Sequence, residues 1–315
     1  MPEELAIKYL EQLGLREETR EFLKGLVSSL LKEIDVLIDG GEKPRSLYQA
    51  SRHILGRGKM LRPLITLMVS EACGGEHQKA IKLALAAELL HTASLIHDDI
   101  IDDAETRRGV KSVHKKFGVS TAIVAGDLLI SLAVKITADL GPRIIGLMSE
   151  AAERMSEGEI LEMESRGREI TLEEYLKIIE KKTASLIEAA TASAAILSGA
   201  SEDEIRAYGD YGRLIGLSLQ VRDDILDVIG KEEFVGKPLR KDHLRGHTNI
   251  VYVLANRKNI DPNKADEIIG RGVIDEAHRI GQDLAKRAIE SLSFLENEKR
   301  ETFEEIAAVI ISRMV

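Results

Sequence analysis

Two groups of aspartates have the residue type and spacing that could bind divalent cations. On a helix, the first and last residues of Asp-Asp-x-x-Asp lie at positions i and i+4, on one face. Carboxylates placed among Leu and Ile repel one another and are costly to desolvate unless a cation lies between them. The chain contains this pattern twice, as Asp98, Asp99 and Asp102 and as Asp223, Asp224 and Asp227.

Mg²⁺ is the cation that best fits two such groups. It prefers octahedral oxygen ligands and is usually held by one or two carboxylates together with substrate phosphates. Two facing helices with paired aspartates would leave coordination positions open for a diphosphate. The alternative is a solvated acidic stripe, which the repeated spacing and the apolar flanks disfavour. His97 and Asp103 could each be a ligand or a hydrogen-bonding neighbour.

A diphosphate site also needs cations from the protein, and three basic groups could supply them. One follows a Gly-containing loop at an expected helix start, where backbone N–H groups favour anions. A second follows the first aspartate group, and its arginines can donate two hydrogen bonds at once to a phosphate. The third lies inside a helical pattern. These groups contain Lys59 and Arg62, Arg107 and Arg108, and Lys181, Lys182 and Thr183.

Helical periodicity positions these residues and dominates the chain. Apolar residues recur at spacings of three and four with charges between them, and period-2 runs typical of strands are nearly absent. The sequence therefore predicts an all-α fold, a single domain over residues 1–315 with ten or more helices. The main expected helices cover 20–38, 60–72, 78–103, 120–139, 143–166, 171–198, 201–229, 272–295 and 299–314.

Composition excludes several other classes of protein. The 315 residues carry a net charge of −9 and are 3% aromatic, which disfavours a nucleic-acid binder. The single cysteine, Cys73, excludes a disulfide scaffold or a cysteine-based zinc site and fits a reducing cytoplasm. Uninterrupted apolar runs fall short of the ~20 residues of a membrane span, and the acidic start does not resemble a signal or transit peptide. We therefore expect a cytoplasmic protein with no membrane span.

Together these motifs resemble the trans-isoprenyl (polyprenyl) diphosphate synthases. Leu95 to Asp102 with Arg107-Arg108-Gly109 is similar to the first aspartate-rich motif of the family, and Gly216 to Asp227 is similar to the second. Gly58-Lys59-x-x-Arg62-Pro63, His91, Lys182-Thr183 and Gly236-Lys237 are also in register. The resemblance covers about residues 45 to 250. It implies the isoprenoid-synthase fold, helices around a central cavity, usually in a homodimer.

The resemblance also implies a reaction and a role for each matching residue. The reaction is the Mg²⁺-dependent, head-to-tail condensation of an allylic diphosphate with isopentenyl diphosphate. Asp98, Asp102 and Asp223 would bind Mg²⁺, assisted by Asp99, Asp224 and Asp227. The allylic diphosphate would be held by Arg107, Lys182, Thr183, Gln220 and Lys237, and isopentenyl diphosphate by Lys59, Arg62, His91 and Arg108. The catalytic set would be Asp98, Asp102, Arg107, Lys182 and Asp223.

One segment departs from the family pattern. The family usually carries Gly-Lys-x-Thr after the second motif, where this chain has Gly246-His247-Thr248 preceded by Arg245. A histidine is mostly neutral at pH 7, so one cation is missing unless Arg245 or Lys241 replaces it.

Product length should depend on residues N-terminal to Asp98. Each helical turn rises about 5.4 Å, roughly one isoprene unit. Ala93 and Ser94 are small, where short-chain members of the family place a bulky aromatic residue, and Leu90 lies one turn further. We expect a product longer than C20. The alternatives are a farnesyl or geranylgeranyl diphosphate synthase with a floor from another helix such as 121–136, a non-catalytic subunit of a heteromeric synthase, and a structural helical scaffold.

Overall fold

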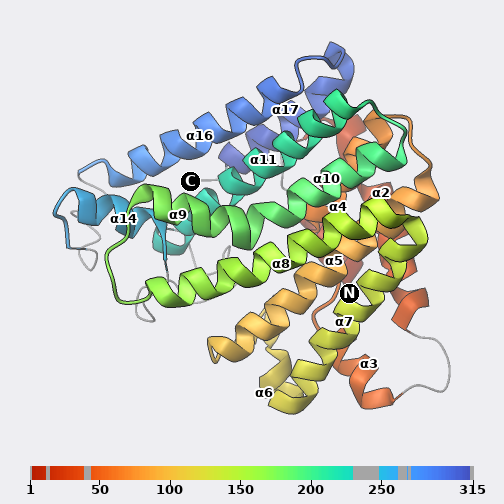
Figure 1. The fold of residues 1–315 in the computed structure, drawn as a ribbon, viewed down its shortest axis with the longest axis horizontal. Coiled ribbons are helices and arrows are strands. Elements are labelled where there is room, and N and C mark those ends of the chain that lie inside the picture. The colour runs from red at the N-terminus through yellow and green to blue at the C-terminus, as the bar shows by residue number, and fades with distance from the viewer. Residues whose placement is uncertain are drawn as a thin grey trace. The chain divides into compact units, whose positions relative to one another are not determined.

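The computed structural model describes residues 2–11, 15–38, 44–229, 248–261, 268 and 271–312, and it is almost entirely helical (Figure 1). The chain divides into two compact units, residues 1–149 with 189–206, and residues 150–188 with 207–315. The boundaries fall within α8 (Pro142–Ser165), α10 (Ser185–Leu197) and α11 (Glu202–Ile229). Whether residues 1–315 act as a single domain remains a prediction.

Unit 1, residues 1–149 with 189–206, is built around the long helix α5 (His77–Ile101), which packs against α2, α4 and α7. Figure 1 shows α5 in orange beside the yellow-green α7. The face of α7 toward α5 carries small residues, including Ala122, Ala125 and Gly126. A Cβ at Gly126 would clash with the His97 ring, so this close approach requires glycine. The elements that begin in this unit are α1 (Pro2–Glu11), α2 (Glu17–Ile38), α3 (Arg45–Arg52), α4 (Leu61–Ala72), α5, β1 (Thr106–Arg107), β2 (Val110–Lys111), α6 (Val113–Phe117), α7 (Val119–Leu140), α8 (Pro142–Ser165) and α11 (Glu202–Ile229).

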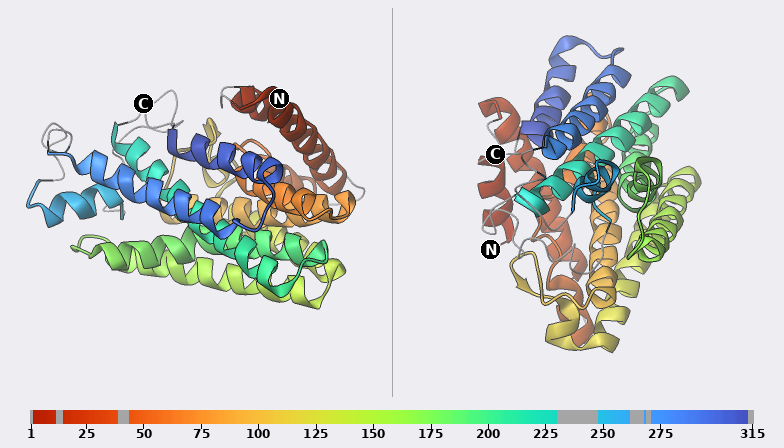
Figure 2. Two further views of the ribbon diagram at one scale, coloured as in Figure 1. Left: turned by 90° about the horizontal axis from the view of Figure 1, so that it is seen from above. Right: turned by 90° about the vertical axis from the view of Figure 1, so that its left-hand side faces the viewer.

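Unit 2, residues 150–188 with 207–315, contains the rest of α8 and α11 and the C-terminal helices. An aromatic cluster forms part of its core, because Phe303 contacts Tyr211 edge to face and packs near Tyr208. Helices α16 and α17 pack side by side, as both views of Figure 2 show. The remaining elements are α9 (Leu172–Ile179), the π-helix η1 (Glu180–Ala184), α10 (Ser185–Leu197), α14 (Ile250–Arg257), α16 (Val273–Ser291) and α17 (Asn297–Ser312).

The predicted all-α class is confirmed, and the long helices lie within a few residues of the predicted ranges. A capping box fixes the start of α9, with Thr171 accepting from the Glu174 N–H and Glu174 accepting from the Thr171 N–H. Two features were not predicted: the β1–β2 hairpin, and the π-helix that interrupts the expected helix 171–198. Both of them carry basic residues of the predicted site.

Two helices are long and apolar enough to cross a membrane by length and composition alone: α5 and α7. The expectation of no membrane span was drawn from uninterrupted apolar runs alone, and it stays a prediction. The apolar window of α5 is 72% buried and that of α7 is 28% buried. Core helices pass the same test, so the finding is weak support for a membrane span.

Candidate active site

The first aspartate group lies where α5 ends. Asp98 and Asp102 are half-buried, and Asp102 caps the helix, its N–H donating to the Asp98 carbonyl at 2.8 Å. The last turn therefore keeps these two aspartates at the i and i+4 positions of a helix, as predicted. Burial is unequal within the triplet, because Asp99 is 0% exposed.

Asp99 pairs with Arg107 of β1. Its Oδ1 accepts a hydrogen bond from the Arg107 Nε at 2.8 Å and lies 2.6 Å from the Arg107 Nη2 in an ion pair. Burial raises the pKa of Asp99, and the Arg107 guanidinium opposes that shift. The hairpin turns the chain back on itself, with Arg107 opposite Val110, and so brings this arginine onto the end of α5. Asp99, predicted as an assisting metal ligand, thus holds the arginine predicted to bind the allylic diphosphate.

A second basic group in unit 1 surrounds His91. The His91 Nε2 lies 3.1 Å from the Arg62 Nη1. Because a guanidinium nitrogen can only donate, Nε2 is the acceptor and the neutral His91 ring carries its proton on Nδ1. Burial, and then the positive charges of Arg62, Arg108 and Arg107, hold the pKa of His91 well below its usual value. The histidine is therefore neutral and offers one N–H donor.

Lys59 and Arg62 lie at the start of α4, as the glycine-containing loop predicted. Met60 precedes the helix in the left-handed conformation, with φ of 55°, and Arg62 follows in the first turn. Lys59 is exposed, and its Nζ lies 5.3 Å from the centre of the Tyr9 ring, a cation–π contact. The loop thus presents two cations beside a helix N-terminus, an arrangement that suits an anion.

The second aspartate group lies near the end of α11, in unit 2. The side chain of Asp223 is 49% exposed and contacts Arg222, whose Nη2 lies 2.7 Å from the Asp223 Oδ1. Asp227 is 2% exposed. Arg222 is itself 2% exposed, which makes it one of the largest buried side chains of the described residues. A buried guanidinium therefore fixes the aspartate that the resemblance assigns to the metal.

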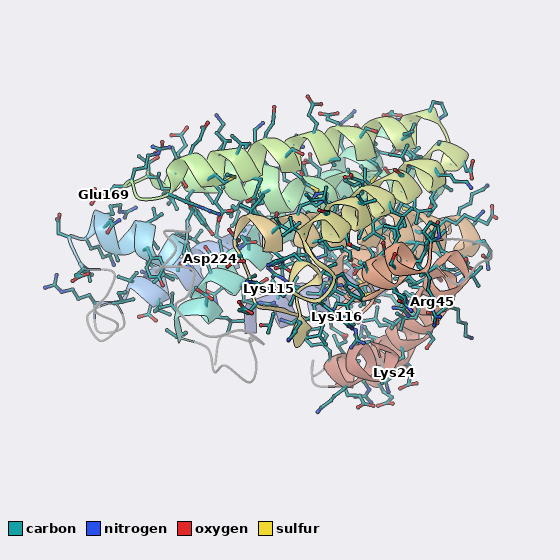
Figure 3. All side chains as sticks on the ribbon, turned by 90° about the horizontal axis from the view of Figure 1, so that it is seen from below. Lys24, Arg45, Lys115, Lys116, Glu169 and Asp224 are labelled. Atoms are coloured by element: carbon teal, nitrogen blue, oxygen red, sulfur yellow. The ribbon has the colours of Figure 1, made fainter. Side chains whose placement is uncertain are left out.

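Asp224 takes three hydrogen bonds from the protein. Its Oδ2 accepts from the Tyr175 hydroxyl and from the Ile250 N–H, both at 2.9 Å, and its Oδ1 accepts from the Gln220 Nε2 at 2.8 Å. Burial raises the pKa of Asp224 to about 7 although these donors oppose the shift. Figure 3 labels Asp224 on α11. This aspartate ties α11 to α9 and α14, a structural connection that the assisting-ligand assignment did not include.

Three of the residues predicted to hold the allylic diphosphate lie in unit 2: Lys182 and Thr183 on η1, and Gln220 on α11. Thr183 donates to the Gln220 Oε1 at 2.9 Å, so both ends of the Gln220 amide have protein partners. Lys182 forms ion pairs with Glu159 and Glu162 of α8, and its Nζ lies 2.5 Å from the Glu159 Oε2. Gly158 allows this contact, because a Cβ there would clash with the Lys182 backbone.

The structure thus brings the predicted residues together in two sets, one in each unit. Unit 1 contains Asp98, Asp99, Asp102, Arg107, the group around His91 and the residues assigned to product length. Unit 2 contains Lys182, Thr183, Gln220, Asp223, Asp224 and Asp227. Lys237, Lys241, Arg245 and His247 lie outside the described residues. Among the described residues, no group of three or more His, Cys, Asp or Glu side chains could hold a metal by itself.

The predicted product-length residues lie on α5 and differ in burial. Ala93 is 1% and Leu90 is 6% exposed, whereas Ser94 is half-buried and donates to the His91 carbonyl at 2.9 Å. The buried residues of α7 are Ala122, Ala125, Gly126, Leu129, Ala133 and Thr137, none of them aromatic. Within unit 1, helix 121–136 therefore provides no buried aromatic side chain that could act as a floor.

Five residues that contact predicted site residues were not identified from the sequence: Glu88, Glu159, Glu162, Tyr175 and Arg222. One signal was available, because Glu88 is the only acidic residue within the apolar stretch from Leu83 to Leu90. Glu159 and Glu162 stand in a helix rich in exposed acidic residues, where nothing marks a buried pair. Tyr175 could not be assigned, because a core tyrosine and a tyrosine that bonds a carboxylate have the same local pattern.

Comparison with known proteins identifies the family of this chain. The family model described as polyprenyl synthetase matches residues 44–283. A short chain isoprenyl diphosphate synthase of Methanothermobacter thermautotrophicus is 38% identical, over 86% of this chain and 91% of that protein. A geranylfarnesyl diphosphate synthase of Natronomonas pharaonis is 33% identical, over 86% of this chain and 91% of that protein. The crystal structure of a geranylgeranyl pyrophosphate synthetase of Pyrococcus horikoshii has a TM-score of 0.85 at 34% identity, covering 94% and 99% of the two chains.

These similarities define an all-α isoprenoid-synthase fold. The chain belongs to the polyprenyl synthetase family, and it is a trans-prenyltransferase.

Proposed function

We propose that the protein condenses an allylic diphosphate with isopentenyl diphosphate, head to tail, in a Mg²⁺-dependent reaction. The observation that carries this proposal is the pair of aspartate groups on α5 and α11, each in contact with an arginine, Arg107 with Asp99 and Arg222 with Asp223. The reaction forms a carbon–carbon bond, releases the diphosphate of the allylic substrate and loses one proton. The product is again an allylic diphosphate, longer by one isoprene unit.

The carboxylates fit Mg²⁺ as the metal. Asp98 and Asp102 on α5, with Asp223 and Asp227 on α11, offer hard oxygen ligands in pairs, and pairs suit an ion that keeps waters and binds substrate phosphate. Bound Mg²⁺ would supply positive charge that stabilises the diphosphate leaving group. Asp99 contacts Arg107, and Asp224 accepts hydrogen bonds from Tyr175 and from the Ile250 N–H. We therefore assign Asp99 to positioning Arg107, and Asp224 to connecting α11 with α9 and α14.

The basic residues bind and orient the allylic diphosphate. Arg107 and Lys182 provide cations where negative charge develops as the carbon–oxygen bond breaks, and such preorganised charge lowers the barrier. Thr183 and Gln220 hold each other, which fixes the Thr183 oxygen beside Lys182. Because Lys182 is paired with two glutamates, we expect its ammonium to share its protons between them and the incoming diphosphate.

Isopentenyl diphosphate would bind to Lys59, Arg62, Arg108 and the neutral His91. The arginines donate in pairs to phosphate oxygens, and the His91 Nδ1 adds one neutral donor. Binding places the isopentenyl double bond beside the allylic cation, which it attacks. The chain offers no dedicated base among the predicted residues, so the departing diphosphate is the acceptor that we assign to the lost proton.

We propose a product longer than C20. The small residues Ala93 and Ser94, and the α7 face without buried aromatics, support this length. A C25 product would fit the relative described as a geranylfarnesyl diphosphate synthase. The alternative is a C15 or C20 product, which the relative described as a short chain isoprenyl diphosphate synthase favours.

We also propose a homodimer in the cytoplasm with no membrane span. The outer face of α7 supports the dimer, because Val119, Ile123, Val124 and Val134 are each more than 40% exposed. A second copy of the chain would cover this apolar face. Contact with a second copy would explain why the apolar window of α7 is only 28% buried, and no lipid environment is then needed to explain it.

The test is turnover by the purified protein. Labelled isopentenyl diphosphate is supplied with geranyl, farnesyl or geranylgeranyl diphosphate, with Mg²⁺ or with EDTA, and the dephosphorylated products are separated by chromatography. We expect Mg²⁺-dependent products longer than C20. A sole C15 or C20 product would support the alternative length, whereas no Mg²⁺-dependent incorporation would overturn the proposed function and favour a non-catalytic subunit. A hydrocarbon product would indicate a cyclase.

A further inference from the structure

A buried carboxylate on α5 lies outside the set of predicted site residues. Glu88 is 1% exposed and stands between Ala87 and Leu89, both fully buried. Its Oε1 accepts a hydrogen bond from the Arg108 Nη1 at 3.0 Å and another from the Thr92 hydroxyl at 3.2 Å. A buried carboxylate is costly unless it is paired and hydrogen-bonded. The arginine is thus the cation that compensates the charge of Glu88.

Arg108 is fixed from three sides. Its Nη1 also donates to the Ile54 carbonyl at 2.9 Å, and its side chain is only 11% exposed. Gly58 leaves room for the guanidinium, because a Cβ there would lie 2.8 Å from the Arg108 Cζ. The backbone of Arg108 is in the left-handed region, with φ of 52°, a conformation that a non-glycine residue keeps only where its surroundings hold it.

Glu88 shares a face of α5 with the basic group around His91. Glu88, His91 and Thr92 lie at positions i, i+3 and i+4 of the helix, so their side chains are neighbours. On this face His91 accepts from Arg62, and Glu88 accepts from Arg108. Because the Arg108 Nη1 donates to both the Glu88 carboxylate and the Ile54 carbonyl, the remaining donors of the guanidinium are on Nε and Nη2.

We propose that Glu88 is a positioning residue for the isopentenyl diphosphate subsite. It holds the Arg108 guanidinium in one orientation and leaves the Nε and Nη2 donors for the diphosphate. A planar guanidinium that is already oriented loses less freedom when it binds phosphate. This inference rests on the proposed function, because it takes Arg108 as a ligand of isopentenyl diphosphate.

The test uses Glu88→Gln in the full-length protein. The substitution keeps the shape of the side chain and removes its charge. We expect the KM for isopentenyl diphosphate to rise about tenfold, with kcat and the KM for the allylic substrate changed less than about twofold. In an Arg108→Gln background, Glu88→Gln should have no further effect on that KM. Glu71→Gln, an exposed glutamate of α4, is the matched control.

Failure of the inference differs from failure of the proposed function. A wild-type protein without turnover would overturn the function itself. An active wild type whose Glu88→Gln variant loses only kcat, or keeps its effect in the Arg108→Gln background, would overturn the positioning role. Circular dichroism checks folding; if Glu88→Gln does not fold, Gly58→Ala places a methyl group against the same guanidinium. That variant should raise the same KM, and an unchanged KM would contradict the inference.

Discussion

Substitution of Asp99 by asparagine separates two roles for this residue. As a metal ligand, Asp99 would set the Mg²⁺ requirement, whereas its contacts give it a role through Arg107. The hydrogen bond from the Arg107 Nε at 2.8 Å and the ion-pair contact of the Arg107 Nη2 at 2.6 Å reach one oxygen of a carboxylate that is 0% exposed. Arg107 is 30% exposed, so solvent screens part of the pair. The asparagine keeps an acceptor but loses the charge, a loss of about 2 kcal/mol.

That loss should appear where Arg107 acts, on the allylic substrate. About 2 kcal/mol corresponds to roughly a 30-fold fall in kcat/KM for the allylic diphosphate. Initial rates at varied Mg²⁺ should give an unchanged midpoint for Asp99→Asn. In contrast, Asp102→Asn should raise that midpoint at least about tenfold. Asp139→Asn, which alters an exposed side chain of α7, is the control.

Two results would refute this reasoning. One is a Mg²⁺ midpoint that shifts in Asp99→Asn as far as in Asp102→Asn, which would make Asp99 a metal ligand. The other is an effect of Asp99→Asn that persists in an Arg107→Gln background, because a residue that acts through Arg107 should then have none.

Three further substitutions test product length, pH dependence and assembly. Ala93→Phe should shorten the product by at least one isoprene unit, and an unchanged product on chromatography would exclude this position as the floor. The pKa of Asp224 is raised from 3.8 to about 7, so the folded state binds its proton more tightly and the free energy of unfolding should fall as pH rises through that range. Urea unfolding of metal-free Asp224→Asn should lack this slope, and a slope equal to wild type would contradict the assignment. Val124→Lys on α7 should weaken the dimer in sedimentation while Val36→Lys on α2 should not; equal masses for both variants would place the interface elsewhere.

The long helices were predictable because their apolar residues recur with the period of a helix over many turns. The β1–β2 hairpin was not, because each strand has two residues and such a strand has no measurable period-2 pattern. The π-helix was not predictable from the sequence either. It lies in a continuous helical pattern, and its backbone packs closely against Gly158 and Gly216, contacts between residues far apart in the sequence.

The aspartate groups were predictable because a repeated charged pattern in apolar helices has few structural explanations. The different contacts of the aspartates within each group were not predictable. Asp98 and Asp99 are adjacent in sequence, yet one is half-buried and the other is paired with Arg107 on a hairpin that the pattern did not reveal. Likewise, Asp224 meets Tyr175 and Ile250, which only the packing of α9 and α14 brings to it.

We propose that aspartates of α5 and of α11 are both needed for Mg²⁺-dependent binding of the allylic diphosphate. Calorimetric titration with a non-reactive thiodiphosphate analogue of farnesyl diphosphate, with and without Mg²⁺, tests it most directly. Binding should require Mg²⁺ in the wild type and weaken more than about tenfold in both Asp98→Asn and Asp223→Asn, but not in Asp203→Asn at the exposed start of α11. If either Asp98→Asn or Asp223→Asn bound the analogue as tightly as wild type, that helix would have no part in holding the metal and the account would be wrong.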